Sequence, residues 1–234
     1  MYYSYDYSFG YLLVILGFII TALAQLLLTS SYSKYKKVES DKGISGKDTA
    51  RRILDNNGLK NVKINEVSGN LTDHYDPRSK TVNLSSDIYS GTSIAAIAVA
   101  AHECGHAIQD KEGYFMLRLR SSMVPIVNLS TRIGYIVLMI SLIAGLLKIA
   151  FIGFILILAS LVFQIVTLPV EFNASSRAKK KIYELNLISE SELNGASKML
   201  FAAALTYVAA VVSTLMQMLR MFLIIVGRNE RNRR

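Results

Sequence analysis

The sequence has few charged residues and almost no cysteine. Only 18% of its 234 residues are charged, and Cys104 is the single cysteine, which excludes a disulfide scaffold. Hydrophobic residues make up 52% of the chain, and a disordered protein lacks this much apolar material. Because these residues lie in long blocks separated by polar stretches, the composition indicates a membrane protein with a water-exposed part.

Acidic residues are also scarce, since 17 Asp and Glu face 26 Lys and Arg and the net charge is +9. The basic residues flank the apolar blocks, at 34–37, 118–132, 177–181 and the C-terminus. A nucleic-acid-binding face instead carries basic residues along one surface with aromatics between them. The pattern is typical of charges that face lipid headgroups, so a lipid bilayer is the expected partner and nucleic acid is not.

The apolar blocks predict about four membrane helices. Residues 10–29 carry no charge and just span a bilayer, and they are expected to be an uncleaved anchor because residues 1–9 lack the positive charge of a signal peptide. Residues 133–170 are interrupted by Lys148 alone and suit a membrane hairpin. Residues 196–227 suit one C-terminal membrane or membrane-associated helix, and a basic tail follows at 228–234.

The polar stretches predict a small folded region at 30–132 and a further polar segment at 171–195. The expected elements are a helix over 45–57, strands near 62–67 and 81–84 that form a hairpin or small sheet, and a helix over 92–110 capped by Ser90 or Thr92. Residues 114–132 resemble an interfacial helix. The positive charges favour a multi-pass protein in the cell membrane, with its N-terminus outside and residues 30–132 in the cytoplasm. If residues 196–227 cross as well, the basic tail at 228–234 ends outside against the same rule, so either this block does not fully cross or the tail is an exception.

Two of the three histidines lie in one short motif. The stretch His102-Glu103-Cys104-Gly105-His106 matches H-E-x-x-H inside the expected helix 92–110. Helix residues i and i+4 share a face, so both imidazoles can reach one zinc ion. Glu103 is rotated from that face and can take a proton from the zinc-activated water and pass it to a leaving amine. The motif predicts one Zn²⁺ per chain, with His102 and His106 as ligands and Glu103 as the base.

A catalytic zinc needs a third protein ligand. No histidine follows the motif, so the ligand is a carboxylate or the upstream His74. Glu171 is favoured because small residues at 174, 175 and 178 would let its helix, expected to start near Pro169, pack closely against the motif helix. Capping of a helix N-terminus is the alternative role for Glu171.

Two further stretches accompany the motif, at 71–78 (Leu-Thr-Asp-His-Tyr-Asp-Pro-Arg) and at 168–175 (Leu-Pro-Val-Glu-Phe-Asn-Ala-Ser). Together with residues 100–109 they resemble the bacterial membrane neutral zinc metallopeptidases, the YugP-like family, over nearly the whole chain. The resemblance implies a gluzincin-type peptidase in which His102, His106 and Glu171 hold the metal and Glu103 is the base. Related membrane proteases usually carry an aspartate where this chain has Ser175, so Asn173 is the residue expected to hydrogen-bond a ligating histidine.

The stretch around His74 and Tyr75 lies near the expected strands. In zinc peptidases an edge strand beside the active-site helix can bind the substrate as an added strand. His74 or Tyr75 could then donate a hydrogen bond to the developing oxyanion. The alternative is a structural turn in which Asp73 or Asp76 bonds its own backbone.

These observations predict a mainly α membrane protein with about four membrane helices and a small α+β zincin-like catalytic region. The expected function is a zinc metalloendopeptidase that hydrolyses membrane-proximal or unfolded proteins, and no particular oligomeric state is indicated. A non-catalytic zinc-binding membrane scaffold or regulator is the alternative. An intramembrane protease is disfavoured because residues 94–101 are too few to span, and a transporter because Lys148 is the only charge within the hairpin.

Overall fold

The computed structural model describes the backbone of residues 3–232 and the side chains of residues 9–226. Four long helices dominate it: α1 (Tyr3–Lys36), α5 (Phe115–Ile143), α6 (Leu147–Glu184) and α7 (Leu193–Asn232). Among the described residues, these are the four helices long and apolar enough to cross a membrane. The chain is therefore a mainly α, multi-pass membrane protein, as the sequence predicts. The side chains of the basic tail at 228–234 lie outside the described ones.

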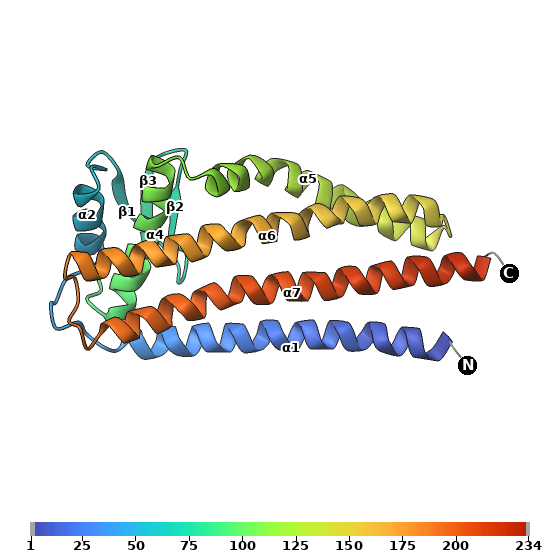
Figure 1. Ribbon diagram of the computed structural model, residues 1–234, viewed down its shortest axis with the longest axis horizontal. Coiled ribbons are helices and arrows are strands. Elements are labelled where there is room, and N and C mark those ends of the chain that lie inside the picture. The colour runs from blue at the N-terminus through green and yellow to red at the C-terminus, as the bar shows by residue number, and fades with distance from the viewer. Residues whose placement is uncertain (1–2, 233–234) are drawn as a thin grey trace. The chain divides into compact units, whose positions relative to one another are not determined.

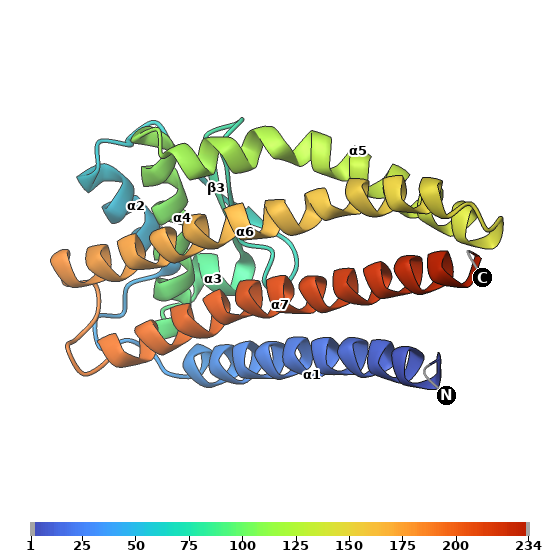
Figure 2. The same ribbon diagram turned by 45° about the vertical axis from the view of Figure 1, so that its right-hand side comes forward.

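The chain, drawn in Figures 1 and 2, divides into two compact units whose boundaries fall within α1, α5, α6 and α7. The first unit contains residues 1–24, 119–168 and 206–234. Helices α5 and α6 form a hairpin there, with its turn at Gly145, whose φ of +73° favours glycine. The two helices approach closely at Gly134 and Gly153, where a Cβ on Gly134 would lie 2.9 Å from the Gly153 carbonyl oxygen. The two helices extend beyond the expected bounds of 133 and 170, since α5 begins at Phe115 and α6 ends at Glu184.

The second unit contains residues 25–118 and 169–205 and carries all strands that the structure describes. Strands β1 (Lys63–Val67), β2 (His74–Asp76) and β3 (Thr81–Ser85) form a sheet in the order β1-β3-β2. β3 pairs in parallel with β1 and antiparallel with β2, with Tyr75 opposite Val82. A sheet rather than a β1–β3 hairpin is therefore correct, and β2 is an edge strand that the sequence pattern did not predict.

Three shorter helices complete this unit: α2 (Gly46–Asn56), α3 (Ser86–Ser90) and α4 (Ile94–Lys111). The hydroxyl of Ser45 caps α2 by accepting from the Asp48 N–H, and Gly58 follows with a φ of +68°. Helix α4 is capped by Ser93, whose hydroxyl accepts from the Ala96 N–H, so the expected caps Ser90 and Thr92 are wrong. Both helices otherwise lie where the sequence predicts them.

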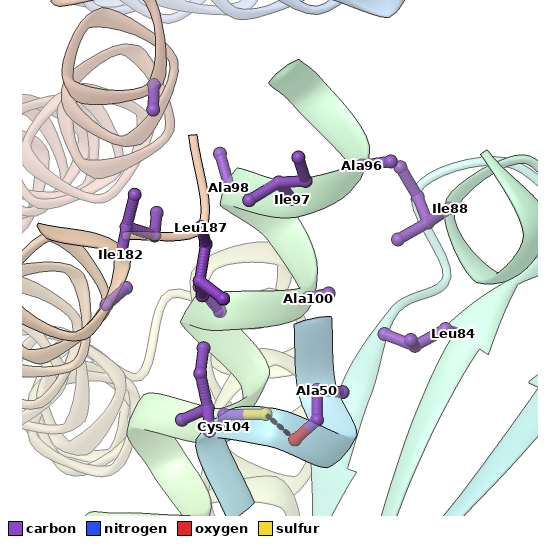
Figure 3. Close-up of a cluster of buried hydrophobic side chains, with 14 of the residues drawn as sticks. Ala50, Leu84, Ile88, Ala96, Ile97, Ala98, Ala100, Cys104, Ile182 and Leu187 are labelled. Atoms are coloured by element: carbon purple, nitrogen blue, oxygen red, sulfur yellow. Dashed lines mark hydrogen bonds between the residues drawn. The ribbon is translucent and has the colours of Figure 1, made fainter. Parts of the chain in front are cut away.

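The core of the second unit surrounds the alanine-rich half of α4 (Figure 3). Ile97 on α4, Leu84 on β3 and Ile182 on α6 are all buried in it. Cys104 lies fully buried on the face of α4 toward α2, with its sulfur 3.6 Å from the Ala50 carbonyl oxygen. Burial raises the pKa of this thiol far above its ordinary value, so Cys104 is a packing residue rather than a reactive one.

Helix α6 differs from the expected boundary at residue 170. Pro169 lies inside the helix, which continues without a break from the apolar segment through Glu171 to Glu184. Proline is tolerated inside membrane helices because neighbouring groups satisfy the freed carbonyl. The expectation that a separate helix starts near Pro169 is therefore wrong, and Glu171 belongs to the same helix as the second half of the hairpin.

Candidate metal centre

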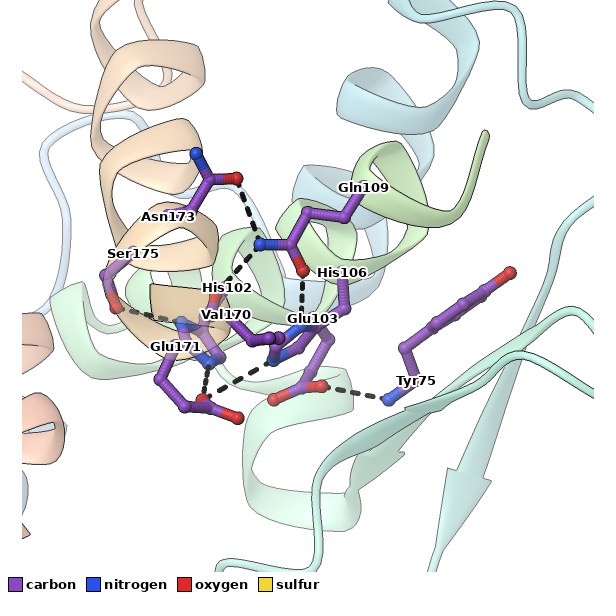
Figure 4. Close-up of polar contacts among 9 residues, drawn as sticks. All are labelled: Tyr75, His102, Glu103, His106, Gln109, Val170, Glu171, Asn173 and Ser175. Atoms are coloured by element: carbon purple, nitrogen blue, oxygen red, sulfur yellow. Dashed lines mark hydrogen bonds and ion pairs between the residues drawn. The ribbon is translucent and has the colours of Figure 1, made fainter. Parts of the chain in front are cut away.

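The centre is built where α4 crosses α6 within the second unit. Gly105 makes this crossing close, because a Cβ placed on it would lie 2.6 Å from the carbonyl oxygen of Ala174. One turn of α4 carries His102 and His106, and α6 presents Glu171 to them (Figure 4). The small residues at this contact, which the sequence predicts at 174, 175 and 178, thus let α6 bring the Glu171 carboxylate to the two imidazoles.

His102, His106 and Glu171 form a group in which the ligand atoms all lie within 4.8 Å of one another. The Nε2 atoms of His102 and His106 lie 3.3 and 3.6 Å from the same Glu171 oxygen. Two ligands about 2.0–2.1 Å from a tetrahedral zinc are about 3.4 Å apart, so the three side chains fit this ion. The carboxylate of Glu171 is only 2% exposed, as a ligand to an enclosed metal must be.

Gln109, on the same face of α4, fixes the orientation of the His106 ring. Its side-chain amide nitrogen donates to the Val170 carbonyl oxygen at 2.8 Å, so its oxygen must face His106. That oxygen lies 3.0 Å from Nδ1 of His106, which therefore carries the proton. The Nε2 lone pair is then free to face Glu171, which is the tautomer a zinc ligand needs.

Ser175 supports His102 in the same way. Its hydroxyl lies 3.2 Å from Nδ1 of His102 and can accept that N–H, which leaves Nε2 directed at Glu171. Asn173, the residue expected to contact a histidine, reaches His106 only through Gln109, whose amide nitrogen it accepts at 3.0 Å. The side-chain oxygen of Asn173 also accepts from Nε of Arg177 at 2.7 Å, which holds the Asn173 amide in place. The structure thus gives the direct contact to Ser175 and an indirect one to Asn173.

Burial and charge act in opposite directions on His106. Burial lowers the pKa of its imidazole, but the carboxylates of Glu171 and Glu103 raise it more, so the pKa lies above its ordinary value. The net effect shows that the pocket around His106 favours positive charge. A divalent cation at this point would meet the same favourable field.

Glu103 lies beside the cluster on the adjoining face of α4 and is 8% exposed. Its carboxylate accepts the backbone N–H of Tyr75 on β2 at 2.9 Å (Figure 4). The Tyr75 hydroxyl instead donates to Asp110 at 2.7 Å, and burial together with this bond raises the pKa of the phenol well above 10. The backbone of Tyr75, not its side chain, therefore faces the candidate base.

His74 is not brought to the cluster. Its exposed ring donates from Nδ1 to the Thr72 carbonyl oxygen at 2.8 Å, and its Nε2 lies 3.2 Å from the Asn83 amide nitrogen. The group of possible metal ligands among the described residues contains Glu171 and not His74. Of the two candidates for the third ligand, the geometry thus favours Glu171.

Sequence reasoning missed Gln109 and the supporting role of Ser175. Gln109 is fully buried three residues after His106, a position on the same helical face, and this spacing is the only signal that could have identified it. Asp110, four residues after His106, is largely covered and pairs with both Tyr75 and Lys80.

Comparison with known proteins identifies the family of the chain. The family model described as "Putative neutral zinc metallopeptidase" matches residues 10–226. The chain belongs to this family. It is also 48% identical over 208 residues to the "Putative membrane protease YugP" of Bacillus subtilis (strain 168), covering 88% of this chain and 92% of that protein. No solved structure matches the chain.

The matched region includes the motif helix, the edge strand and the residue favoured as third ligand. The resemblance inferred from the three sequence stretches is thereby confirmed at the level of the family. Membership indicates a membrane-associated zinc metallopeptidase, and the three-residue cluster is where a zinc ion fits in this chain.

Proposed function

We propose that this protein is a membrane-bound zinc metalloendopeptidase of gluzincin type. His102, His106 and Glu171 would hold one Zn²⁺ per chain, and Glu103 would act first as base and then as acid. The observation that carries the proposal is the convergence of both Nε2 atoms on one Glu171 oxygen, at 3.3 and 3.6 Å, with Glu103 on the adjoining face. When bound, zinc polarises the scissile carbonyl and acidifies a water molecule.

The residues of the chain perform the remaining steps. Glu103 takes a proton at its carboxylate and returns it to the leaving amine, while Gln109 and Ser175 keep the two imidazoles in one tautomer. Asn173 holds Gln109, and so acts on His106 only indirectly. Glu103 accepts the Tyr75 N–H at one carboxylate oxygen, and its other oxygen can accept the water.

Strand β2 is the proposed binding edge for the substrate. It lies at the end of the sheet order, and its Tyr75 N–H faces Glu103 rather than β3. An extended peptide can pair with such an edge beside the base. The Tyr75 N–H could then exchange Glu103 for the peptide or the oxyanion, and the exposed His74 ring on the same strand could exchange its Asn83 contact for a substrate group.

Orientation is proposed from the basic residues. Lys34, Lys36 and Lys37 lie at and just after the end of α1, and Arg177 to Lys181 lie on α6 beyond Glu171. Positive charges flanking a membrane span remain in the cytoplasm, so the metal centre would be cytoplasmic and the N-terminus outside. Protease protection of a tag on each side in sealed vesicles checks this arrangement.

The test is hydrolysis of a fluorescently labelled unfolded protein by enzyme in lipid nanodiscs. Because the base is lost, the Glu103→Gln variant should hydrolyse the substrate about 10²–10⁴-fold more slowly than wild type while it retains about one zinc per chain. Glu66→Gln, at an exposed glutamate on β1, is the matched control and should cleave like wild type. Equal cleavage by Glu103→Gln would contradict the mechanism, and zinc binding without hydrolysis by wild type would favour a scaffold.

A further inference from the structure

Helix α6 joins the membrane segment and the metal centre without a linker. Residues 149–170 carry no charge, Lys148 precedes them, and Glu171 follows them directly on the same unbroken helix (Figure 1). At 1.5 Å per residue this uncharged run is about 33 Å long, and the hydrocarbon core of a bilayer is about 30 Å thick. The run is therefore just long enough to cross.

Because the uncharged run is only slightly longer than the hydrocarbon core is thick, the distance between the Glu171 carboxylate and the membrane boundary can vary little. Lys148 can extend its ammonium to the headgroups from slightly inside the core, whereas the shorter Glu171 cannot. Any tilt shortens the projection of the run on the membrane normal. With both charged ends outside the hydrocarbon, Glu171 lies within roughly 10 Å of the membrane boundary, which is less than two helical turns.

The second unit also carries exposed apolar side chains. Phe172 follows Glu171 and is 44% exposed, and Phe115 on α5 and Phe201 on α7 are exposed as well. Exposing such rings to water costs free energy that contact with lipid avoids. Ile165, Phe172 and Tyr183 are exposed on one face of α6. This face therefore extends from the uncharged run into the polar end of the helix.

We propose that the metal centre lies at the membrane boundary and that its substrates are polypeptides anchored in the same bilayer, cut within a few residues of their anchor. An extended strand advances about 3.3 Å per residue, so a depth of roughly 10 Å corresponds to about three residues. An anchored chain thus reaches the edge of β2 almost as soon as it leaves the membrane. This assignment of substrate class rests on the proposed peptidase function.

The first experiment measures depth without activity. Ile165→Cys, Phe172→Cys and Tyr183→Cys place single thiols along one exposed face of α6, and the buried Cys104 remains as a silent background. A water-soluble maleimide is applied to the full chain in nanodiscs. A thiol at the hydrocarbon boundary has its pKa raised by about one unit or more, so Phe172→Cys should react about tenfold more slowly than Tyr183→Cys, and Ile165→Cys should not react. Equal rates for Phe172→Cys and Tyr183→Cys would overturn the assigned depth.

The second experiment compares one flexible segment in two forms, attached to the end of a single membrane helix or free in solution. With the enzyme and the anchored form in the same vesicles, the anchor raises the effective concentration, so anchored cleavage should be about tenfold or more faster than free cleavage. Moving the segment away from the anchor by added residues should leave the cut at about 3–6 residues from the helix end. Equal cleavage rates of the anchored and free forms would overturn the substrate assignment. So would a cut that stays at the same peptide bond of the segment when added residues move that bond away from the anchor.

The two proposals fail in different ways. If wild type but not Glu103→Gln cleaves the free segment and the anchor has no effect, the peptidase function stands and the anchored-substrate assignment is wrong. If neither form is cut, the peptidase function fails together with the substrate class, while the maleimide rates still decide the depth of the centre.

Discussion

Gly105 of α4 lies directly against Ala174 of α6, because a Cβ on the glycine would come within 2.6 Å of the alanine carbonyl oxygen. No side chain larger than hydrogen fits there without moving one helix. The distance between the two histidines and Glu171 is therefore set by the absence of a single methyl group.

Replacing this glycine tests the relationship. Gly105→Ala should push α6 away from α4, lower the free energy of unfolding by about 1–3 kcal/mol and remove most of the bound zinc. Metal content per chain and the thermal midpoint are the measurements. Gly134→Ala is the matched control, since its Cβ would meet Gly153 and Leu156 in the hairpin at 2.9 Å. It should destabilise the protein but keep the zinc, and equal zinc loss in both variants would refute the argument.

Removing the amide of Gln109 should weaken zinc binding without emptying the core. Gln109→Met leaves Nδ1 of His106 without its acceptor, and loss of such a supporting contact typically costs 10–100-fold in metal affinity. Asn173→Ala should cost less, because Gln109 keeps its bond to the Val170 carbonyl. Competition with a chelator of known affinity measures both. The order of the two effects is the prediction, and a larger loss for Asn173→Ala would contradict the assigned contacts.

Ser175 gives a second, independent test of ring orientation. Ser175→Ala removes the hydroxyl 3.2 Å from Nδ1 of His102 and should lower zinc affinity toward the small end of the same range, about tenfold. Ser175→Asp supplies a stronger acceptor and should restore or exceed the wild-type affinity. The neighbouring Ser176 is exposed, so Ser176→Ala should change nothing measurable. Indistinguishable affinities for Ser175→Ala and wild type would remove Ser175 from the centre.

The carboxyl group of Glu192 should make the free energy of unfolding depend on pH. Burial raises the pKa of its carboxyl, but hydrogen bonds from the backbones of Ser189 and Asp41 lower it more, so the folded-state pKa lies below the usual 4.5. Its contribution is therefore fully present above pH 4.5 and is lost as the pH falls through the folded-state pKa. Glu192→Gln should lower the free energy of unfolding by about 1–3 kcal/mol at pH 7, and the difference from wild type should shrink in acid.

Thermal unfolding in detergent at pH 7 and at pH 4 measures this difference. The exposed Glu190 supplies the matched control, and Glu190→Gln should follow wild type at both values. A deficit of Glu192→Gln that stayed constant across this range would show that the carboxylate charge is not what stabilises the fold.

The main features of the site could be predicted because two local signals coincide. The spacing of His102 and His106 fixes them on one helical face, and small residues after Glu171 indicate a close helix contact. The role of Gln109 could not be predicted, since a glutamine in a helix carries no signal of what its amide reaches across the fold. Only tertiary contacts reveal that Glu192 is buried among the Ser40, Asp41 and Ser189 groups.

The apolar blocks of the sequence predict the long helices well, whereas the short elements are harder to predict. Strand β2 spans only His74–Asp76, too few residues for an alternating pattern to be detected. Proline usually interrupts helices in water, so Pro169 predicts a helix start, whereas α6 continues through it. The apolar stretch and the polar stretch after it thus belong to one continuous helix.

The continuity of α6 has a consequence for the biosynthesis of the protein. Glu171, the Val170 carbonyl and Ser175 all belong to one short stretch of α6, so the third member of the cluster, the acceptor that holds Gln109 and the hydroxyl that contacts His102 arrive together. Helix α4 is synthesised before α6, and until α6 has been inserted and docked it presents only two of the three side chains of the centre. Under the proposed function, a chain whose α6 has not yet docked lacks the third ligand, so hydrolysis would begin only once α6 is in place.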